Sequence, residues 1–327
     1  MNILIITKSD DHEGVQLTID AIKKNGGVPV RFNTDCFPTE VRLDMSYGLE
    51  GERLILITPE LEIDLREIDS VYYRRAAYGD KIPLTMDSQY RNACLQESKL
   101  TIEGLLTSLR AYHVDPLWNV RRASVKQFQL QLAQSLGLMI PKTLITNNPK
   151  TVKEFYGFCS GLMITKMQAS FAIYQEGVES VVFTSKVKEE DLEDLDGLAL
   201  SPMMFQELVP KKLEFRVTIV GNQIFSSAID SQKYEKTRID WRRDGIGLID
   251  KWEPVDLPKD IEEKLFALMD KLQLQYGAID LLQRPDGSFV FLEVNPAGEY
   301  FWLDRQRERT ISNTLAELLM GKHRRRV

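Results

Sequence analysis

The sequence has few cysteines, few histidines and no long apolar run, and each shortage disfavours a class of protein. None of its three cysteines form a CxxC pair, which argues against a disulfide framework and a zinc site, so we expect buried, unreactive thiols. The three histidines lie far apart and near no serine or cysteine signature, which disfavours a catalytic triad. The apolar runs are too short to span a bilayer. These residues are Cys36, Cys94, Cys159, His12, His113 and His323.

Positive charge is also in short supply. The formal net charge is -6, and general nucleic-acid binders rely on a basic surface, so we expect no nucleic-acid partner. The one strongly basic run, "KHRRRV" at 322–327, is expected to be a solvated tail. The opening "MNILIITKSDD" is typical of a buried strand rather than of an export signal, which favours a cytoplasmic location and no membrane partner.

Two common nucleotide-binding motifs are missing. No GxGxxG follows the first predicted strand, so a Rossmann dinucleotide site loses its main support. The chain also has no GxxxxGK[ST], which excludes a P-loop. A nucleotide site in this chain would therefore have to be built from other residues.

Length and composition favour a soluble protein of several parts, because 327 residues exceed what one core usually supports. The strand "NILIIT", a helical pattern that stops at Gly26 and Gly27, and the strand "VPVRFNTD" predict a parallel sheet. Pro116 interrupts the pattern near 115–120. We therefore predict an α+β and α/β chain with an N-terminal α/β domain at 1–115, a central lobe at 116–200 and a C-terminal lobe at 201–327.

Apolar spacing and turn residues predict the remaining elements. Helices are expected at 85–111, 121–136, 149–158, 188–196, 258–273 and 308–320. Strands are expected at 40–47, 52–58, 70–76, 138–146, 161–167, 180–185, 202–209, 213–221, 223–230, 276–283 and 288–295.

A hairpin near the end of the chain groups oxygen-bearing side chains. Asp280 precedes its "PDG" turn, and Glu293 and Asn295 follow the turn. Residues two apart share one face of a strand, so folding the hairpin brings the three side chains together. Two acids and an amide suit Mg²⁺ when a substrate phosphate supplies further ligands. The other interpretation is a solvated polar face, but "FVFLEV" looks buried on both sides, where unpaired carboxylates would be costly.

Basic residues in apolar surroundings predict a phosphate site. Lys126 lies in an amphipathic helix, Lys166 ends the strand "LMITK", and Arg216 sits within "LEFRVTIV". One such residue could be a snorkelling surface chain, whereas three together with the oxygen-ligand hairpin favour a phosphate cage. Arg242 and Arg243, in the predicted loop "DWRRDG", are candidate clamps for a carboxylate or a γ-phosphate.

The segment "FQELVP" supplies what an adenine site needs. Glu207, Leu208 and Val209 end a strand, where backbone groups can meet a base edge between apolar side chains. Glu214 follows closely enough to accept the ribose hydroxyls. Alone, this signal is weak.

The order of these motifs resembles the ATP-grasp superfamily from about residue 121 to the end of the chain. Within it the chain is similar to the ligases related to ribosomal-protein glutamate ligase, and most of all to the graspetide (microviridin-type) peptide macrocyclases. The matching stretches are "FNTDCFPTEV", "VYYRR", "KQFQLQLAQSLGLMIPKTLITNNP" and "FLEVNPAGEYFWL", which extend the resemblance over nearly the whole chain.

The resemblance implies ATP and two Mg²⁺ ions as cofactors, a homodimer, and no covalent enzyme nucleophile. In that family ATP phosphorylates a Glu or Asp side chain of a ribosomal precursor peptide. A Thr or Ser hydroxyl, or a Lys amine, then attacks to give an ester or amide ring with ADP and phosphate. The implied ligands are Lys126 and Lys166 for the ATP phosphates, Glu207 and Val209 for adenine, Glu214 for ribose, Arg216 for the γ-phosphate and the acyl phosphate, and Asp280, Glu293 and Asn295 for metal.

The resemblance also implies a leader peptide, which would dock on "KVKEEDLEDLDG" at 186–197. These acids could bind an arginine of a helical leader or form a solvated acidic helix. The paired arginines of "VYYRR" could approach an acidic core peptide or form a surface salt bridge. An aspartate after the second strand could orient a peptide group or form a turn. The predicted substrate-binding residues are Glu190, Asp191, Asp194, Arg74, Arg75 and Asp35.

The sequence is also compatible with two other functions. A ligase that joins free amino acids, or adds glutamate to a protein, would keep the nucleotide site and differ in the acceptor cleft. A regulatory protein with an inactive site is disfavoured because the expected ligands occur in the expected order. No residue decides between ester and amide rings, with a slight preference for the ester.

Overall fold

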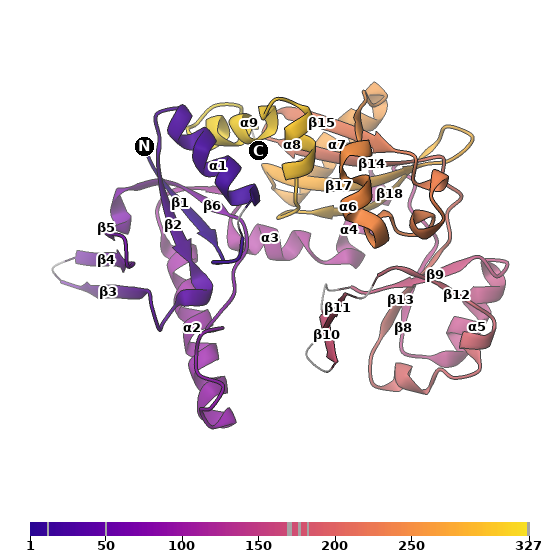
Figure 1. Ribbon diagram of the computed structural model, residues 1–327, viewed down its shortest axis with the longest axis horizontal. Helices are drawn as coiled ribbons and strands as arrows, with labels where there is room; N and C mark the ends of the chain where they lie inside the picture. The colour runs from indigo at the N-terminus through magenta and orange to yellow at the C-terminus, as the bar shows by residue number, and fades with distance from the viewer. Residues whose placement is uncertain (12, 50, 169–171, 176–177, 182, 326–327) are drawn as a thin grey trace.

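The computed structural model describes residues 1–11, 13–49, 51–168, 172–175, 178–181 and 183–325. Figure 1 shows three parts: an α/β unit at the N-terminus, a smaller lobe, and a larger sheet with helices in the C-terminal half. No helix in these described ranges combines the length and apolar character needed to cross a membrane. His12, one of the three histidines, lies outside the described residues.

The N-terminal unit is built on a four-stranded parallel sheet, in the order β2 (Val28–Asn33), β1 (Asn2–Thr7), β6 (Ile68–Tyr73) and β7 (Tyr112–Val114). Ile3 to Ile6 in β1 are fully buried, as expected where helices cover a parallel sheet. From β1 the chain passes to β2 on one side of β1, and it later returns to β6 on the other side of β1. The carboxyl ends of β1 and β6 therefore form a topological switch point, where such sheets bind ligands.

Other elements complete this unit. Helix α1 (Glu13–Lys24) follows β1 and packs its apolar side into the core. A separate antiparallel sheet of three strands lies beside the main sheet, formed by β3 (Arg42–Gly48), β4 (Gly51–Ile57) and β5 (Glu62–Asp64). The long helix α2 (Ser88–Ser108) confirms the predicted helix and projects from the body of the molecule (Figure 1).

The smaller lobe is an antiparallel sheet, in the order β12 (Ser185–Val187), β9 (Met163–Lys166), β13 (Met203–Glu207) and β8 (Thr143–Thr146). Helix α5 (Pro149–Phe158) packs on it through Val152, which shares a core with Met163 and Phe205. A hairpin of β10 (Ala172–Gln175) and β11 (Val178–Val181) lies beside this lobe (Figure 1).

The C-terminal sheet is antiparallel, in the order β16 (Glu253–Pro254), β15 (Gln223–Ile229), β14 (Leu213–Val220), β17 (Tyr276–Gln283) and β18 (Phe289–Asn295). One core joins this sheet to the helices α3 (Leu117–Ala123), α4 (Lys126–Ser135) and α7 (Lys259–Leu272). The short helix α6 (Gly245–Leu248) lies in the loop between β15 and β16. Helices α8 (Phe301–Gln306) and α9 (Thr310–Leu319) join the sheet to α1, and Figure 1 shows α9 beside α1. The predicted domain boundaries stay predictions.

Several predicted elements need correction. The helix expected at 121–136 is two helices, α3 and α4, because Val125 is extended and begins the second helix. The acidic helix expected at 188–196 consists of two short 3-10 helices, Glu190–Leu192 and Asp196–Ala199. Acidic side chains accept hydrogen bonds from nearby backbone N–H groups there, which competes with a regular helix.

Several further elements were missed, including the short strands β5, β7 and β16. The connection expected before 180–185 contains β10, and the strand expected at 180–185 is divided between β11 and β12, with residue 182 outside the described residues. Helix α8 precedes the closing helix, which itself is confirmed.

Cys36 and Cys159 are buried, and burial raises the pKa of both thiols. Cys94 is only half-buried, so the prediction of buried thiols is wrong for Cys94.

Within its described residues, 322–325, the basic C-terminal segment is docked through Arg324 and Arg325, so the prediction of a solvated tail is wrong for this part. Arg325 Nε lies 2.5 Å from Asp270 Oδ1, and Arg325 Nη1 donates to the Gly221 carbonyl at 2.7 Å. The side chain of Arg325 is 7% exposed. Arg324 stacks on the Tyr112 ring of the N-terminal unit. Charge composition alone does not reveal these partners, which lie far away in sequence.

Candidate active site

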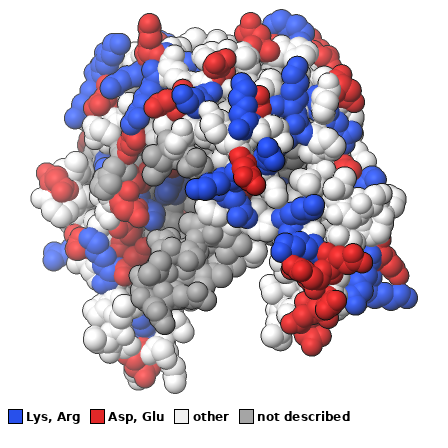
Figure 2. All heavy atoms as spheres, turned by 45° about the vertical axis from the view of Figure 1, so that its right-hand side comes forward, with Lys and Arg blue, Asp and Glu red and all other residues white. Residues whose placement is uncertain are grey.

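A pocket of about 460 Å³ lies between the smaller lobe and the C-terminal sheet. This volume falls within the range of roughly 300–1,000 Å³ that is typical of small-molecule sites. In Figure 2 the molecule is hollowed between its upper part and the lobe at lower right, and basic side chains border the hollow. Of the residues predicted to bind nucleotide or metal, the structure brings all except the candidate clamp Arg243 into this one pocket: Lys126, Lys166, Glu207, Leu208, Val209, Glu214, Arg216, Arg242, Asp280, Glu293 and Asn295. Their individual roles stay predictions.

Three of these residues form a row across adjacent strands. The strand register sets Arg216 opposite Asp280, and Asp280 opposite Glu293. Arg216 Nη1 donates to Asp280 Oδ1 at 2.8 Å. A β-bulge beside Asp280 leaves Leu292 without a partner on β17, so Leu292 and Glu293 both line the pocket although they are neighbours in sequence. Asn295, two residues after Glu293, lines the same pocket, as the shared strand face requires.

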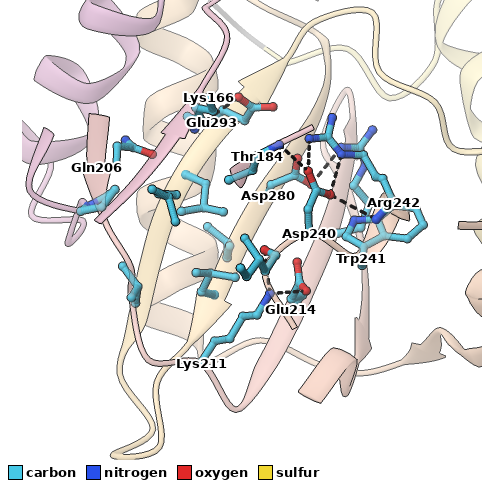
Figure 3. Close-up of a pocket in the computed structure, with 18 of the residues that line it drawn as sticks. Lys166, Thr184, Gln206, Lys211, Glu214, Asp240, Trp241, Arg242, Asp280 and Glu293 are labelled. Atoms are coloured by element: carbon cyan, nitrogen blue, oxygen red, sulfur yellow. Dashed lines mark hydrogen bonds and ion pairs between the residues drawn. The ribbon is translucent and has the colours of Figure 1, made fainter. Parts of the chain in front are cut away.

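Glu293 meets the two predicted phosphate-binding lysines. Its Oε2 lies 2.8 Å from Lys126 Nζ and 3.8 Å from Lys166 Nζ. Burial alone would raise the pKa of Glu293, but the cations Lys166, Lys126 and Arg242 outweigh burial and lower that pKa to about 2. Burial lowers the pKa of Lys166, although Glu293 opposes this. The carboxylate is therefore ionised, and it supplies the anion that an inward-facing Lys166 requires (Figure 3).

A second ion pair lies at the other end of the pocket (Figure 3). Lys211 Nζ is 2.7 Å from Glu214 Oε1 and 3.2 Å from the Ile239 carbonyl oxygen. Burial raises the pKa of Glu214, and Lys211 opposes the shift. Sequence reasoning gave Lys211 no role, although its position three residues before Glu214 was visible.

The segment 207–209 lies between these two ends. The Glu207 side chain accepts from the Lys142 N–H at 3.2 Å and lies 3.4 Å from Arg284. The N–H group of Glu207 donates to the Lys142 carbonyl, and that of Leu208 donates to the Leu162 carbonyl. Of the three N–H groups in this segment, that of Val209 is the one not engaged in these bonds.

Arg242 is held at the pocket by a buried carboxylate. Its Nη2 lies 2.6 Å from Asp240 Oδ2, which also accepts from the Thr184 N–H at 3.2 Å (Figure 3). The neighbouring Arg243 does not line the pocket and instead donates to the Thr184 carbonyl and to Ser185, both at 2.9 Å. These bonds tie the loop carrying Arg242 to the smaller lobe.

The predicted peptide-binding residues of the N-terminal unit lie outside the pocket. Arg74 is 1% exposed and Arg75 is 37% exposed, and both guanidinium groups contact Glu299. The interpretation of Arg74 as a surface salt bridge is therefore wrong, because it is part of an internal cluster. Asp35 is buried and accepts from the backbone N–H of Ser9 at 2.8 Å and from its hydroxyl.

The acidic residues predicted for leader docking are exposed on the smaller lobe. Glu190 lies 2.7 Å from Lys188 Nζ, and Asp191 accepts from the Lys188 N–H at 2.8 Å. Asp194 accepts from the Asp196 N–H in the next turn. Figure 2 shows acidic side chains gathered on the lobe at lower right, so an acidic surface is available to a partner.

Sequence reasoning missed an aromatic cluster that closes one side of the pocket. Trp241, Trp252 and Trp302 all line it, with ring centroids 5.1 Å apart for Trp241 and Trp252 and 5.7 Å apart for Trp241 and Trp302. The guanidinium carbon of Arg216 lies 5.6 Å from the Trp302 ring centroid. Glu299 also lines the pocket. The available signal was the stretch "GEYFW" directly after the predicted metal ligands.

The donor set decides which metal the site suits. Among the described residues, no group of three or more His, Cys, Asp or Glu side chains could hold an ion. Asp280, Glu293 and Asn295 offer oxygen atoms only, and too few for an all-protein cage. This set fits Mg²⁺ that takes its remaining ligands from phosphate and water.

Comparisons with known proteins agree with this geometry. A family model described as the MvdD pre-ATP grasp domain matches residues 2–121. The macrocyclase MdnC from Microcystis aeruginosa MRC, solved with the precursor peptide MdnA, is 45% identical, covers 98% of this chain and 100% of its own, and has a TM-score of 0.89. A RiPP-associated ATP-grasp ligase from Chryseobacterium gregarium, solved with ADP and a leader and core peptide, is 41% identical, with coverage of 100% and 99% and a TM-score of 0.93.

A third similar structure is the macrocyclase MdnB from Microcystis aeruginosa MRC, which is 34% identical, with coverage of 97% and 98% and a TM-score of 0.83. No curated protein matches the chain. The fold and the pocket define an ATP-grasp ligase, and the chain belongs to the ATP-grasp family that contains these peptide macrocyclases.

Proposed function

We propose that this protein is an ATP-dependent peptide macrocyclase. It phosphorylates Glu or Asp side chains of a ribosomally made precursor peptide and joins them to Thr or Ser hydroxyls as esters, or to Lys amines as amides. The observation that carries the proposal is the one pocket in which oxygen ligands, several cations and the 207–209 segment meet. The precursor, leader and core peptides bound to the similar enzymes support a peptide substrate.

The nucleotide would lie along the pocket with its phosphates toward Glu293 and its ribose toward Glu214. Lys126 and Lys166 would exchange the Glu293 carboxylate for phosphate oxygens once that carboxylate binds metal. Val209 would meet the adenine edge, beside Glu207 and Leu208. Two Mg²⁺ ions held by Asp280, Glu293 and Asn295 would neutralise phosphate charge and polarise the transferred group.

Arginines would stabilise the charge that develops during transfer. Asp280 directs Arg216 and Asp240 directs Arg242, so neither guanidinium has to reorganise as the reaction proceeds. The terminal phosphoryl group moves from ATP to a carboxylate oxygen of the peptide, and ADP leaves. The hydroxyl or amine of the same peptide then attacks the carbonyl carbon and loses its proton, and phosphate leaves. Each ring therefore removes one water from the peptide.

The substrate would be held at two places outside the nucleotide pocket. Glu190, Asp191 and Asp194 present carboxylates that suit an arginine of the leader. Arg75, which is partly exposed beside Glu299, suits an acidic residue of the core peptide, with Arg74 supporting it from the interior. Asp35 holds the loop after β1 through Ser9 and would act on the peptide only through that loop.

We also propose a homodimer in the cytoplasm. Exposed apolar side chains on and before α2, among them Tyr90, Leu100 and Leu84, support an additional contact surface on the projecting helix. Light scattering of the purified protein tests this proposal, because a mass of one chain across the working concentration range contradicts a dimer. Retention of the protein with the soluble cell fraction tests the location.

The function is tested with Mg²⁺-ATP and a leader-bearing peptide rich in Thr and Glu. ADP release and the intact mass of the peptide are followed for the wild type and for Glu293→Gln. We expect loss of one water per ring, in step with ADP, and neither product from the variant. ADP release without dehydration, or only after free amino acids are added, would instead identify a ligase for free amino acids. Peptides that carry either Lys or Thr at the acceptor position then show whether the enzyme forms amide or ester rings.

A further inference from the structure

Glu299 belongs to the C-terminal unit but places its carboxylate against the N-terminal unit. It follows β18 by four residues, and its Oε1 accepts from the Nη2 atoms of both Arg74 and Arg75. A Cβ added to Gly14, at the start of α1, would lie 3.2 Å from Glu299 Oε2, so the carboxylate sits close to the first turn of that helix. Glu299 thus fills the crevice between β1 and β6, where a sheet of this topology binds a ligand.

The opposite side of the same loop holds Arg216. Arg216 Nη2 donates to the Glu299 carbonyl at 3.0 Å, while Nη1 donates to Asp280 at 2.8 Å. A Cβ on Gly298 would lie 2.8 Å from Arg216 Nη2, so the absence of a side chain lets the loop pass this close. The Tyr276 hydroxyl donates to the Gly298 carbonyl at 2.6 Å, which gives the loop a further fixed contact with β17.

The charges around Glu299 make its contact with Arg74 and Arg75 specific. Arg74 is buried, and its other contacts are the Ala297 carbonyl and Asp11 Oδ2, the latter 3.6 Å from Arg74 Nε. Arg75 Nε lies 3.0 Å from the same Asp11 oxygen. One aspartate cannot neutralise two guanidinium groups, so Glu299 completes the charge balance of the cluster.

We propose that Glu299 is a positioning residue for phosphoryl transfer. Its carboxylate anchors the 297–299 loop to Arg74 and Arg75, and the anchored Glu299 carbonyl directs Arg216 at the γ-phosphate. The proposal rests on the proposed function, because it uses the γ-phosphate role of Arg216. It gives the N-terminal unit a part in nucleotide selection, since that unit supplies both arginines of the anchor. The Oε1 atom of Glu299 already accepts from both arginines, so Glu299 is not assigned as a base.

The test compares two nucleotides that differ in the γ-phosphate. Dissociation constants are measured by calorimetry for Mg²⁺-ADP and for a Mg²⁺-bound ATP analogue with a non-transferable γ-phosphate. In Glu299→Gln we expect about tenfold weaker binding of the triphosphate analogue, the effect of one charged hydrogen bond, and an unchanged constant for ADP. Equal weakening of both nucleotides, or of neither, overturns the proposal.

Glu13→Gln is the matched control. Glu13 in α1 forms an ion pair with Arg305 in α8, so it joins the same two units without touching Arg216. We expect this variant to bind both nucleotides like the wild type. If it reproduces the selective loss, the effect comes from loosening the units in general and the specific role of Glu299 is refuted.

A second pair of variants keeps the test valid if Glu299→Gln folds poorly. Arg75→Gln alters the anchor from its exposed side, and we expect the same selective loss at about two- to fivefold, since Arg74 remains. In an Arg216→Lys background, Glu299→Gln should add no further selective loss, and an additive loss would contradict action through Arg216. The nucleotide selectivity is measured without peptide, so a wild type that forms no rings refutes the proposed function and leaves this result readable.

Discussion

Asp115 provides a pH-dependent test of how the N-terminal unit is joined to the C-terminal sheet. Its carboxylate is 2% exposed and accepts from the Gln275 N–H at 2.7 Å and the Tyr276 N–H at 3.0 Å, at the start of β17. Burial raises the pKa of Asp115 from its ordinary 3.8 to about 7, although these two N–H groups and Arg325 oppose the shift.

The sign of the effect follows from proton binding. Between the two pKa values the folded protein binds more protons at Asp115 than the unfolded chain does, so this contribution to stability is present at low pH. It is lost as the pH rises through 7. The loss amounts to roughly 3 kcal/mol in the free energy of unfolding between pH 5 and pH 8.

The assay is urea unfolding of the wild type and Asp115→Asn at a series of pH values. Subtracting the variant removes the titration of all other groups, including His113. In the variant, the side-chain NH₂ of asparagine lies against one of the two backbone N–H groups, which then has no acceptor. The variant is therefore expected to be less stable at pH 5. The difference between the proteins should shrink by roughly 3 kcal/mol toward pH 8. Parallel pH profiles would refute a raised pKa at Asp115.

The remaining predictions concern the pocket, the leader surface and the C-terminal segment. Lys166→Gln should weaken Mg²⁺-ADP binding by about tenfold or more in calorimetry, since it removes a partly buried cation, and an unchanged constant would exclude Lys166 from the phosphate site. Glu190→Lys should weaken leader-peptide binding by about tenfold through charge repulsion, measured by fluorescence anisotropy, whereas equal affinity would place the leader elsewhere. Arg325→Ala should destabilise the fold by roughly 1 kcal/mol, because the Gly221 carbonyl loses its donor and the half-exposed Asp270 loses its partner, and an unchanged unfolding midpoint would make the docked segment irrelevant to stability.

The sequence was informative where chemistry follows local spacing. Glu293 and Asn295 share a face because they are two residues apart, and the "PDG" turn brings Asp280 back beside them. The requirement of Lys166 for an anion was also readable, and Glu293 meets it. The β-bulge at Leu292 was not readable, because one extra residue in an apolar strand changes no periodicity that a short window can detect.

Features that depend on distant partners escaped prediction. Arg74 and Glu299 are separated by 225 positions, and "VYYRR" read alone is a strand that ends in surface charge. The C-terminal arginines have the composition of a solvated tail, yet Arg325 finds its partners at Asp270 and Gly221. Buried ion pairs of this kind are set by tertiary packing, which brings together groups that each look solvent-exposed in the linear sequence.

The charges of the pocket are matched before any ligand binds. Lys126 and Lys166 face Glu293, Arg216 faces Asp280, and Arg242 faces Asp240. A nucleotide without metal would have to compete with Glu293 for Lys126 and Lys166, and a metal without nucleotide would have to displace the two lysines from Glu293. Together the two ligands satisfy both sets of charges, so each should raise the affinity for the other by the same factor. The pairing therefore favours the metal–nucleotide complex over either component alone, which is the substrate form that phosphoryl transfer requires.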